Sequence, residues 1–213
     1  MDRYIPELLF TGPAVAPVTF AFAHGAGVPI DHPFMNTVAQ GVSQAGIRVA
    51  RFEFPYMQAR RIHGTRRPPN RAPALIDTWL TMIEALGGGE ELVIGGKSMG
   101  GRIASLIADE VEAKGLICLG YPFHPLGKSD RLRVEHLTDL KTRTLILQGE
   151  RDRFGSRDEV EGYDLSPAIT VSWLPDGDHS FKPRKAAGMT EADNLHAAVD
   201  EIVAFIRQQD VRI

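Results

Sequence analysis

Short apolar segments alternate along the chain with longer segments of helical periodicity, and this alternation restricts the fold more than any other feature. Strands are expected where β-branched and aromatic residues cluster, in segments 16–25, 47–54, 91–96, 115–122, 142–152 and 168–179. Helices are expected over 32–46, 74–88, 98–114 and 192–209. Strands that are apolar on both faces and separated by helices form parallel sheets covered by helices on each side. The sequence therefore predicts a three-layer α/β fold with a mostly parallel sheet of about six to seven strands.

Composition limits the partners that such a chain can have. The 213 residues contain no repeat and no linker, so we expect a single domain over residues 1–213. A net charge of −3 attracts neither nucleic acid nor an anionic membrane surface. The N-terminal segment lacks the apolar core of a secretory signal, and no apolar run is long enough to cross a membrane. A cytoplasmic protein, monomeric or homodimeric, is expected. The only cysteine, Cys118, lies in an apolar segment and excludes an internal disulfide.

Several chemically active residues follow directly after predicted strands. They are His24, Ser98, Tyr121, Asp152 and His179. Because ligands of a parallel sheet bind at the carboxyl ends of its strands, we expect these residues to lie along one edge. A serine, an aspartate and a histidine are therefore predicted to meet there.

The segment Glu91 to Arg102, ELVIGGKSMGGR, is compatible at first sight with two kinds of site. A phosphate-binding P-loop requires glycine where Glu91 stands, and the strand continues to Lys97, which leaves no loop to surround a phosphate. G-x-S-x-G, the turn that displays a nucleophilic serine, fits better, since a strand enters and a helix leaves directly. On this motif alone, Ser98 can equally be a serine that caps the helix.

The residues after two later strands favour a nucleophilic serine. A serine hydroxyl needs a base, and the base needs an acid that orients it. Asp152 and His179 occur in the order serine, acid, histidine that accompanies this turn, with room for a strand and a helix in each interval. Glu150 and Asp178 are alternative acids, but Asp178 adjoins His179, and neighbouring side chains rarely bond well to each other's ring nitrogen. Ser98, Asp152 and His179 are therefore the predicted catalytic residues.

A set of segments resembles a known family. They are HGAG (24–27), FPYM (54–57), GGKSMGGR (95–102), QGERDRFGS (148–156) and GDHSF (177–181). Together they resemble the small α/β-hydrolases without a lid, including the dienelactone-hydrolase group. They resemble more closely the bacterial relatives of the hydrolase-like domain in a subunit of the NSL histone acetyltransferase complex. The resemblance implies a lidless α/β-hydrolase fold, with Ser98 as nucleophile, Asp152 as acid and His179 as base. Few residues precede segment 16–25, so the first strands of the full fold should be short or missing.

An oxyanion hole requires backbone N–H groups close to the nucleophile. The Met99 N–H directly follows Ser98, and the Ala26 N–H lies in the glycine-containing loop after the first long strand. We therefore predict that these two groups form the hole. Residues near the strand ends are further candidates for contact with substrate: His24, Gly25, Lys97, Tyr121, Arg66 and Arg67.

A polar loop is predicted from Tyr56 to Pro73. It carries five arginines between Tyr56 and Arg71 and no acidic residue. It can recognise a carboxylate or phosphate on the substrate, or it can be a solvated loop, which the composition favours. No metal-binding spacing joins His24 to His179, so neither a metal nor a cofactor is expected.

The expected function is that of a serine hydrolase acting on a small ester, thioester or amide, a carboxylesterase or thioesterase of class EC 3.1. Only about ten residues separate strand 115–122 from the segment that begins at residue 133, where larger hydrolases insert a lid. The substrate is then a small acyl compound, anionic if the arginine loop contacts it. Two alternatives stay open: a non-catalytic binding or scaffold module, and a triad enzyme that hydrolyses C–C bonds or forms peracids.

Overall fold

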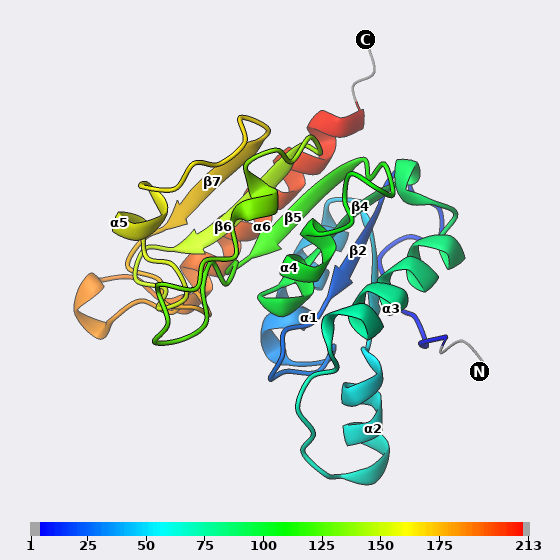
Figure 1. The fold of residues 1–213 in the computed structure, drawn as a ribbon. Coiled ribbons are helices and arrows are strands. Elements are labelled where there is room, and N and C mark those ends of the chain that lie inside the picture. Colours follow the sequence, from blue (N-terminus) through cyan, green and yellow to red (C-terminus); the bar gives the residue numbers. More distant parts are fainter. Residues whose placement is uncertain (1–4, 211–213) are drawn as a thin grey trace.

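The computed structural model describes residues 5–210, which form one seven-stranded sheet in the order β1-β3-β2-β4-β5-β6-β7 (Figure 1). The strands are β1 (Leu9–Thr11), β2 (Thr19–Ala23), β3 (Arg48–Phe52), β4 (Leu92–Lys97), β5 (Gly115–Leu119), β6 (Thr144–Gly149) and β7 (Ile169–Leu174). Every neighbouring pair is parallel except β1 with β3. The predicted mostly parallel sheet of six to seven strands is confirmed, and the first strand is short, as expected.

Helices lie on both faces of the sheet. They are α1 (Pro33–Gln44), α2 (Pro55–His63), α3 (Ala72–Ala85), α4 (Met99–Ser105), α5 (Arg157–Val160) and α6 (Glu191–Asp210). Val38 of α1 and Ile202 of α6 belong to one buried cluster. Trp79 of α3 and Ile103 of α4 belong to a second cluster on the opposite face. The sheet therefore separates two apolar layers, as the uninterrupted apolar strands predict (Figure 1).

The centre of the sheet is packed closely enough that only glycine fits at two positions of β4. A Cβ atom on Gly95 would lie 1.9 Å from the carbonyl oxygen of Ile117 in β5. A Cβ atom on Gly96 would lie 2.8 Å from the backbone nitrogen of Gly101 in α4. These contacts hold α4 directly against the sheet, so the turn between β4 and α4 has a fixed position.

The arginine-rich segment differs from its prediction as a loop. Its first part is helix α2, which begins at Pro55 and buries Tyr56 and Met57. Gly64, with φ of 67°, ends the helix, and residues 64–71 are irregular. Proline suits the first position of a helix and glycine suits its end, and two apolar residues anchor the first turn. Figure 1 shows α2 projecting from the body of the molecule.

The helix predicted over 98–114 is also shorter than expected. Helix α4 ends at Ser105, and turns continue the chain to residue 112. Among the helices within residues 5–210, none has the length and apolar character needed to span a bilayer.

Candidate active site

The turn between β4 and α4 holds Ser98 in a strained backbone conformation. Its φ of 51° and ψ of −114° lie where side-chain-bearing residues are rarely found. The Ser98 N–H donates a hydrogen bond of 2.9 Å to the carbonyl of Leu119 in β5. The strand and the helix therefore hold the serine hydroxyl at the carboxyl edge of the sheet, as the G-x-S-x-G motif predicts.

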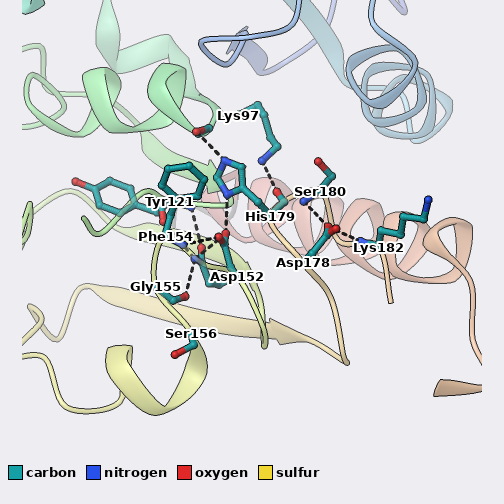
Figure 2. Close-up of polar contacts among 12 residues, drawn as sticks. Lys97, Tyr121, Asp152, Phe154, Gly155, Ser156, Asp178, His179, Ser180 and Lys182 are labelled. Atoms are coloured by element: carbon teal, nitrogen blue, oxygen red, sulfur yellow. Dashed lines mark hydrogen bonds and ion pairs between the residues drawn. The ribbon is translucent and has the colours of Figure 1, made fainter. Parts of the chain in front are cut away.

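Ser98, His179 and Asp152 form a continuous chain of hydrogen bonds. His179 Nε2 lies 2.9 Å from Ser98 Oγ, and His179 Nδ1 lies 2.7 Å from Asp152 Oδ2. The three residues follow β4, β7 and β6, so the parallel strands bring them to one edge. Figure 2 shows His179 and Asp152 facing each other. The structure thus brings together the three predicted catalytic residues.

The carboxylate of Asp152 is fully buried and accepts three hydrogen bonds. Besides His179, the Phe154 N–H donates to Oδ1 at 2.9 Å and the Gln148 side chain donates to Oδ2 at 3.1 Å. A carboxylate has only acceptor sites and can accept all three bonds. In this arrangement His179 Nδ1 carries the proton that it donates to Asp152, and the free Nε2 can accept the proton of Ser98.

Gln148 is a site residue that the sequence analysis missed. Its side chain accepts from the Tyr121 N–H at 2.8 Å and donates to Asp152 and to the carbonyl of Gly155. These contacts fix which end of the amide faces Asp152. The signal in the sequence is a polar residue inside the apolar strand 142–149.

Burial governs the acid–base behaviour of His179. Burial lowers the pKa of His179 below its usual value, the hydrogen bond that His179 donates to Asp152 opposes this, and the charge of Lys97 lowers the pKa further. The net effect is a lowered pKa, so the imidazole is neutral near pH 7 and ready to accept a proton.

The two alternative acids have other partners. Asp178 accepts hydrogen bonds from the backbone N–H groups of Ser180 and Lys182, at 2.8 and 3.0 Å (Figure 2). Glu150 binds the Asp176 N–H and the Arg157 side chain. Among these three carboxylates only Asp152 therefore bonds to His179.

The Lys97 side chain, a predicted substrate contact, does not line the surface depression that contains Ser98. This side chain is buried, and Nζ donates a hydrogen bond to the carbonyl oxygen of His179 (Figure 2). The ammonium also lies over the rings of Phe34 and Phe181, at 5.4 and 5.8 Å from their centres. Burial lowers the pKa of Lys97 to about 8. Lys97 thus connects β4 to the backbone of the histidine loop.

The side chains of His24 and Tyr121, also predicted to contact substrate, are fully buried. His24 Nε2 accepts from the Phe54 N–H at 3.1 Å, and Nδ1 donates to the carbonyl of Gly25 at 2.7 Å, so the ring braces the loop that follows β2. The Tyr121 hydroxyl donates to the carbonyl of Arg133 at 3.0 Å. Neither side chain lines the depression at Ser98.

The loop of residues 24–27 lies beside the serine turn. A Cβ atom on Gly25 would lie 3.5 Å from the Cβ atom of Ser98. Ala26, Met99 and Ser98 all line one depression of about 320 Å³. Within residues 5–210, the N–H groups of Ala26 and Met99 donate no hydrogen bond to another protein group. Two unpaired backbone donors therefore lie at the depression that contains the serine.

The loop arginines lie next to this depression and do not line it. Arg66 and Arg67 are exposed and line a second depression together with Arg60 and Gly27. The two depressions share Ala26 and Pro69. A contact between Arg66 or Arg67 and a substrate at Ser98 thus requires a substrate that extends beyond the first depression.

Two other arginines line the depression at Ser98, and the sequence analysis missed both. Arg102 lies one helical turn after Ser98, and this spacing could have predicted that both residues face the same site. Arg133 lies in a segment without periodicity, so no comparable signal indicates it. Within residues 5–210, no group of three or more His, Cys, Asp or Glu residues gathers where it could hold a metal ion.

The order of the strands and the serine turn after β4 define an α/β-hydrolase fold. The chain matches the alpha/beta hydrolase domain family over residues 16–207 and belongs to that family.

Solved structures share the fold at low sequence identity. An α/β serine hydrolase without a lid from Xanthomonas campestris is 20% identical, with a TM-score of 0.68 over 97% of this chain and 89% of that one. Dienelactone hydrolase from Anabaena variabilis is 18% identical, with a TM-score of 0.68 over 96% and 99%. Est1E from Butyrivibrio proteoclasticus, solved with ferulic acid bound, is 14% identical, with a TM-score of 0.71 over 97% and 96%.

Proposed function

We propose that the protein is a serine hydrolase that cleaves a small ester, thioester or amide through an acyl-enzyme at Ser98. The observation that supports this most strongly is the chain of hydrogen bonds from Ser98 Oγ through His179 to the buried carboxylate of Asp152. A base that contacts the hydroxyl and an acid that orients the base are what a weak nucleophile needs. Family membership agrees with this chemistry.

In the proposed reaction, Ser98 Oγ attacks the acyl carbonyl while His179 Nε2 takes the hydroxyl proton. Asp152 keeps the Nδ1 proton in place and stabilises the imidazolium that forms. The unpaired N–H groups of Ala26 and Met99 are the proposed donors to the oxyanion, an interaction worth about 3–4 kcal/mol per donor. His179 then protonates the leaving group, and a water molecule activated by the same nitrogen releases the acid.

The surroundings of Ser98 favour a small substrate of the EC 3.1 type. Residues 120–134, where a lid would be inserted, contain no helix, and the depression of about 320 Å³ is open to solvent. The lack of a lid in the Xanthomonas hydrolase and the ferulic acid bound to Est1E are consistent with an open site for small acyl compounds.

The competing function is a non-catalytic binding module, to which the resemblance to the NSL subunit domain points. A module that no longer turns over substrate has no need of a strained serine, a histidine and a buried acid in hydrogen-bond contact. That geometry favours the enzyme.

Turnover of p-nitrophenyl esters tests the proposal. We expect the native protein to release nitrophenol and the Ser98→Ala variant to lose this activity while keeping its circular dichroism spectrum. A Ser98→Ala variant that retains more than about a tenth of the native rate would show that another nucleophile acts. A panel of esters, thioesters and amides then identifies the bond that is cleaved.

A further inference from the structure

Arg102 and Arg133 line the same depression as Ser98, and both extend from a fixed backbone. The Arg102 N–H donates to the carbonyl of Ser98 at 3.0 Å in the first turn of α4. The Arg133 N–H donates to the carbonyl of Phe123 at 2.7 Å, and its own carbonyl accepts from the Tyr121 hydroxyl. Two arginine side chains thus line one small depression from two different parts of the chain.

Neither guanidinium has an acidic partner. Among residues 5–210, no carboxylate lies within 4.0 Å of Arg102 or Arg133. The Nε atom of Arg102 is buried and makes no hydrogen bond. Burial and the charge of Arg102 both lower the pKa of Arg133, as expected for two like charges that line one depression. Buried donors without partners and like charges in proximity are costly arrangements.

Other arginines of this protein bind acidic or carbonyl groups of the protein through their guanidinium groups. Arg61 binds Glu53 at 2.6 Å and Arg151 binds Asp176 at 2.9 Å. Arg51 donates through its terminal nitrogens to the carbonyl of Ile30 and to two side chains, although its Nε, like that of Arg102, makes no hydrogen bond. Among residues 5–210, Arg102 and Arg133 are half-buried and form no ion pair with an acidic side chain.

We propose that Arg102 and Arg133 bind an oxyanion on the substrate, a carboxylate or a phosphate, so that Ser98 acts on an anionic ester. This inference rests on the proposed function of Ser98. Planar guanidinium groups bind carboxylates and phosphates through paired hydrogen bonds, and an anion in this depression supplies the acidic partner that Arg102 and Arg133 lack.

The placement of Arg102 limits where the anion lies on the substrate. Arg102 and Ser98 line the same depression of about 320 Å³, so the anion and the scissile carbonyl belong to one small substrate. The neighbouring depression with Arg60, Arg66 and Arg67 contains no acidic residue. Its positive charge increases the rate at which an anionic substrate reaches the site.

Two esters that differ only in charge test the inference. They are the mono-p-nitrophenyl ester of glutaric acid and its neutral methyl ester. In the native enzyme we expect kcat/KM for the anionic ester to exceed that for the neutral one by about 10-fold to 100-fold. In Arg102→Met and in Arg133→Met this ratio should fall at least about fivefold, since methionine keeps the length of the stem and removes the charge. General effects on Ser98 act on both esters and cancel in the ratio.

Arg131→Met is the matched control, because Arg131 is exposed and does not line the depression. It should leave the ratio at the native value. A native ratio close to one, or equal ratios in the native enzyme and in both pocket variants, would overturn the inference. Competitive inhibition by glutarate or by inorganic phosphate identifies which anion is preferred, and lack of inhibition by either contradicts the proposal.

Binding to a Ser98→Ala variant separates this inference from the proposed function. If the native protein cleaves neither ester but calorimetry shows that Ser98→Ala binds the anionic one more tightly, the hydrolase proposal fails and the anion site stands. If both esters are cleaved at the same rate and bound equally, the hydrolase proposal stands and the anion site fails.

Discussion

Replacing Asp152 with asparagine tests the proposed mechanism at its most buried group. Oδ1 accepts a hydrogen bond from the Phe154 N–H, whereas Oδ2 accepts from both His179 and Gln148. The asparagine amide has only one acceptor oxygen. If this oxygen takes the place of Oδ2, the bonds from His179 and Gln148 are kept; if it takes the place of Oδ1, only the bond from the Phe154 N–H is kept. We therefore expect the amide oxygen to face His179, so that Asp152→Asn preserves the histidine tautomer and removes only the charge.

The size of the effect follows from that lost charge. When His179 becomes an imidazolium, the native carboxylate attracts it, and two unit charges about 4 Å apart interact by about 4 kcal/mol at an effective dielectric constant of 20. Since 1.36 kcal/mol corresponds to a factor of ten in rate, kcat/KM should fall on the order of 10³-fold. An inverted tautomer gives a larger loss, of about 10⁴-fold.

The assay is kcat/KM for a p-nitrophenyl ester measured from pH 5 to pH 9. The hydrogen bond to Asp152 and the charge of its carboxylate both raise the pKa of His179, and Asp152→Asn removes the charge, so the variant should have a lower histidine pKa. Activity requires neutral His179 and is lost as the pH falls through this pKa, so the acidic limb should move to lower pH. Asp178→Asn is the control for the loss of rate, since it removes the same charge from a residue whose carboxylate bonds elsewhere. Because the Asp178 charge also raises the pKa of His179, though less than that of Asp152, its acidic limb should move in the same direction by a smaller amount. A loss below tenfold for Asp152→Asn, or an acidic limb that moves to higher pH, would refute this reasoning.

Further predictions concern the buried lysine and the packing of β4. Because the Lys97 charge lowers the pKa of His179, Lys97→Met should move the acidic limb of the same assay to higher pH. An acidic limb that stays in place would contradict this electrostatic effect of Lys97 on His179. The folded state holds the pKa of Lys97 at about 8 instead of 10.5, so the unfolded chain binds more protons between these values. The free energy of unfolding should therefore rise with pH across this window in the native protein and rise less in Lys97→Met, as urea denaturation will show. Gly95→Ala places a methyl group 1.9 Å from the Ile117 carbonyl and should destabilise the protein by about 3 kcal/mol or more, whereas Gly27→Ala, with open space around it, should stay within about 0.5 kcal/mol. Equal urea midpoints for these two variants contradict the packing described for β4.

The sequence predicted the sheet and the meeting of Ser98, Asp152 and His179 because both depend on simple periodicity. Apolar segments long enough for strands and separated by helices form parallel sheets, and parallel strands end at one edge. Residues that follow different strands then come together without any knowledge of loop structure. The backbone strain at Ser98 follows from the same local pattern.

Side-chain direction was not predictable in the same way. Lys97, His24 and Tyr121 also lie at strand ends, but each side chain turns inward to a backbone partner. Successive side chains of a strand point to opposite faces, so an error of one residue in the predicted strand reverses the direction of a side chain. Beyond the end of the strand, the loop conformation decides this direction. Contacts with substrate at such positions therefore require coordinates.

The arginine residues show a second limit. The high charge of residues 56–71 led to their prediction as a loop, although Tyr56 and Met57 are buried and hold helix α2 against the core. Arg133 reaches the depression only because the chain after β5 folds back, with the Arg133 N–H bonded to the Phe123 carbonyl. Such a contact depends on tertiary structure, and no periodic pattern in the sequence predicts it.

Labelling with a fluorophosphonate probe tests the central proposal most directly, since this reagent reacts with serine hydroxyls activated by a neighbouring base. Mass spectrometry of the native protein should show one adduct, located on the peptide that contains Ser98. His179→Ala should abolish it while the variant stays folded. A native protein that forms no adduct, or that carries it on another residue, would contradict a nucleophilic Ser98.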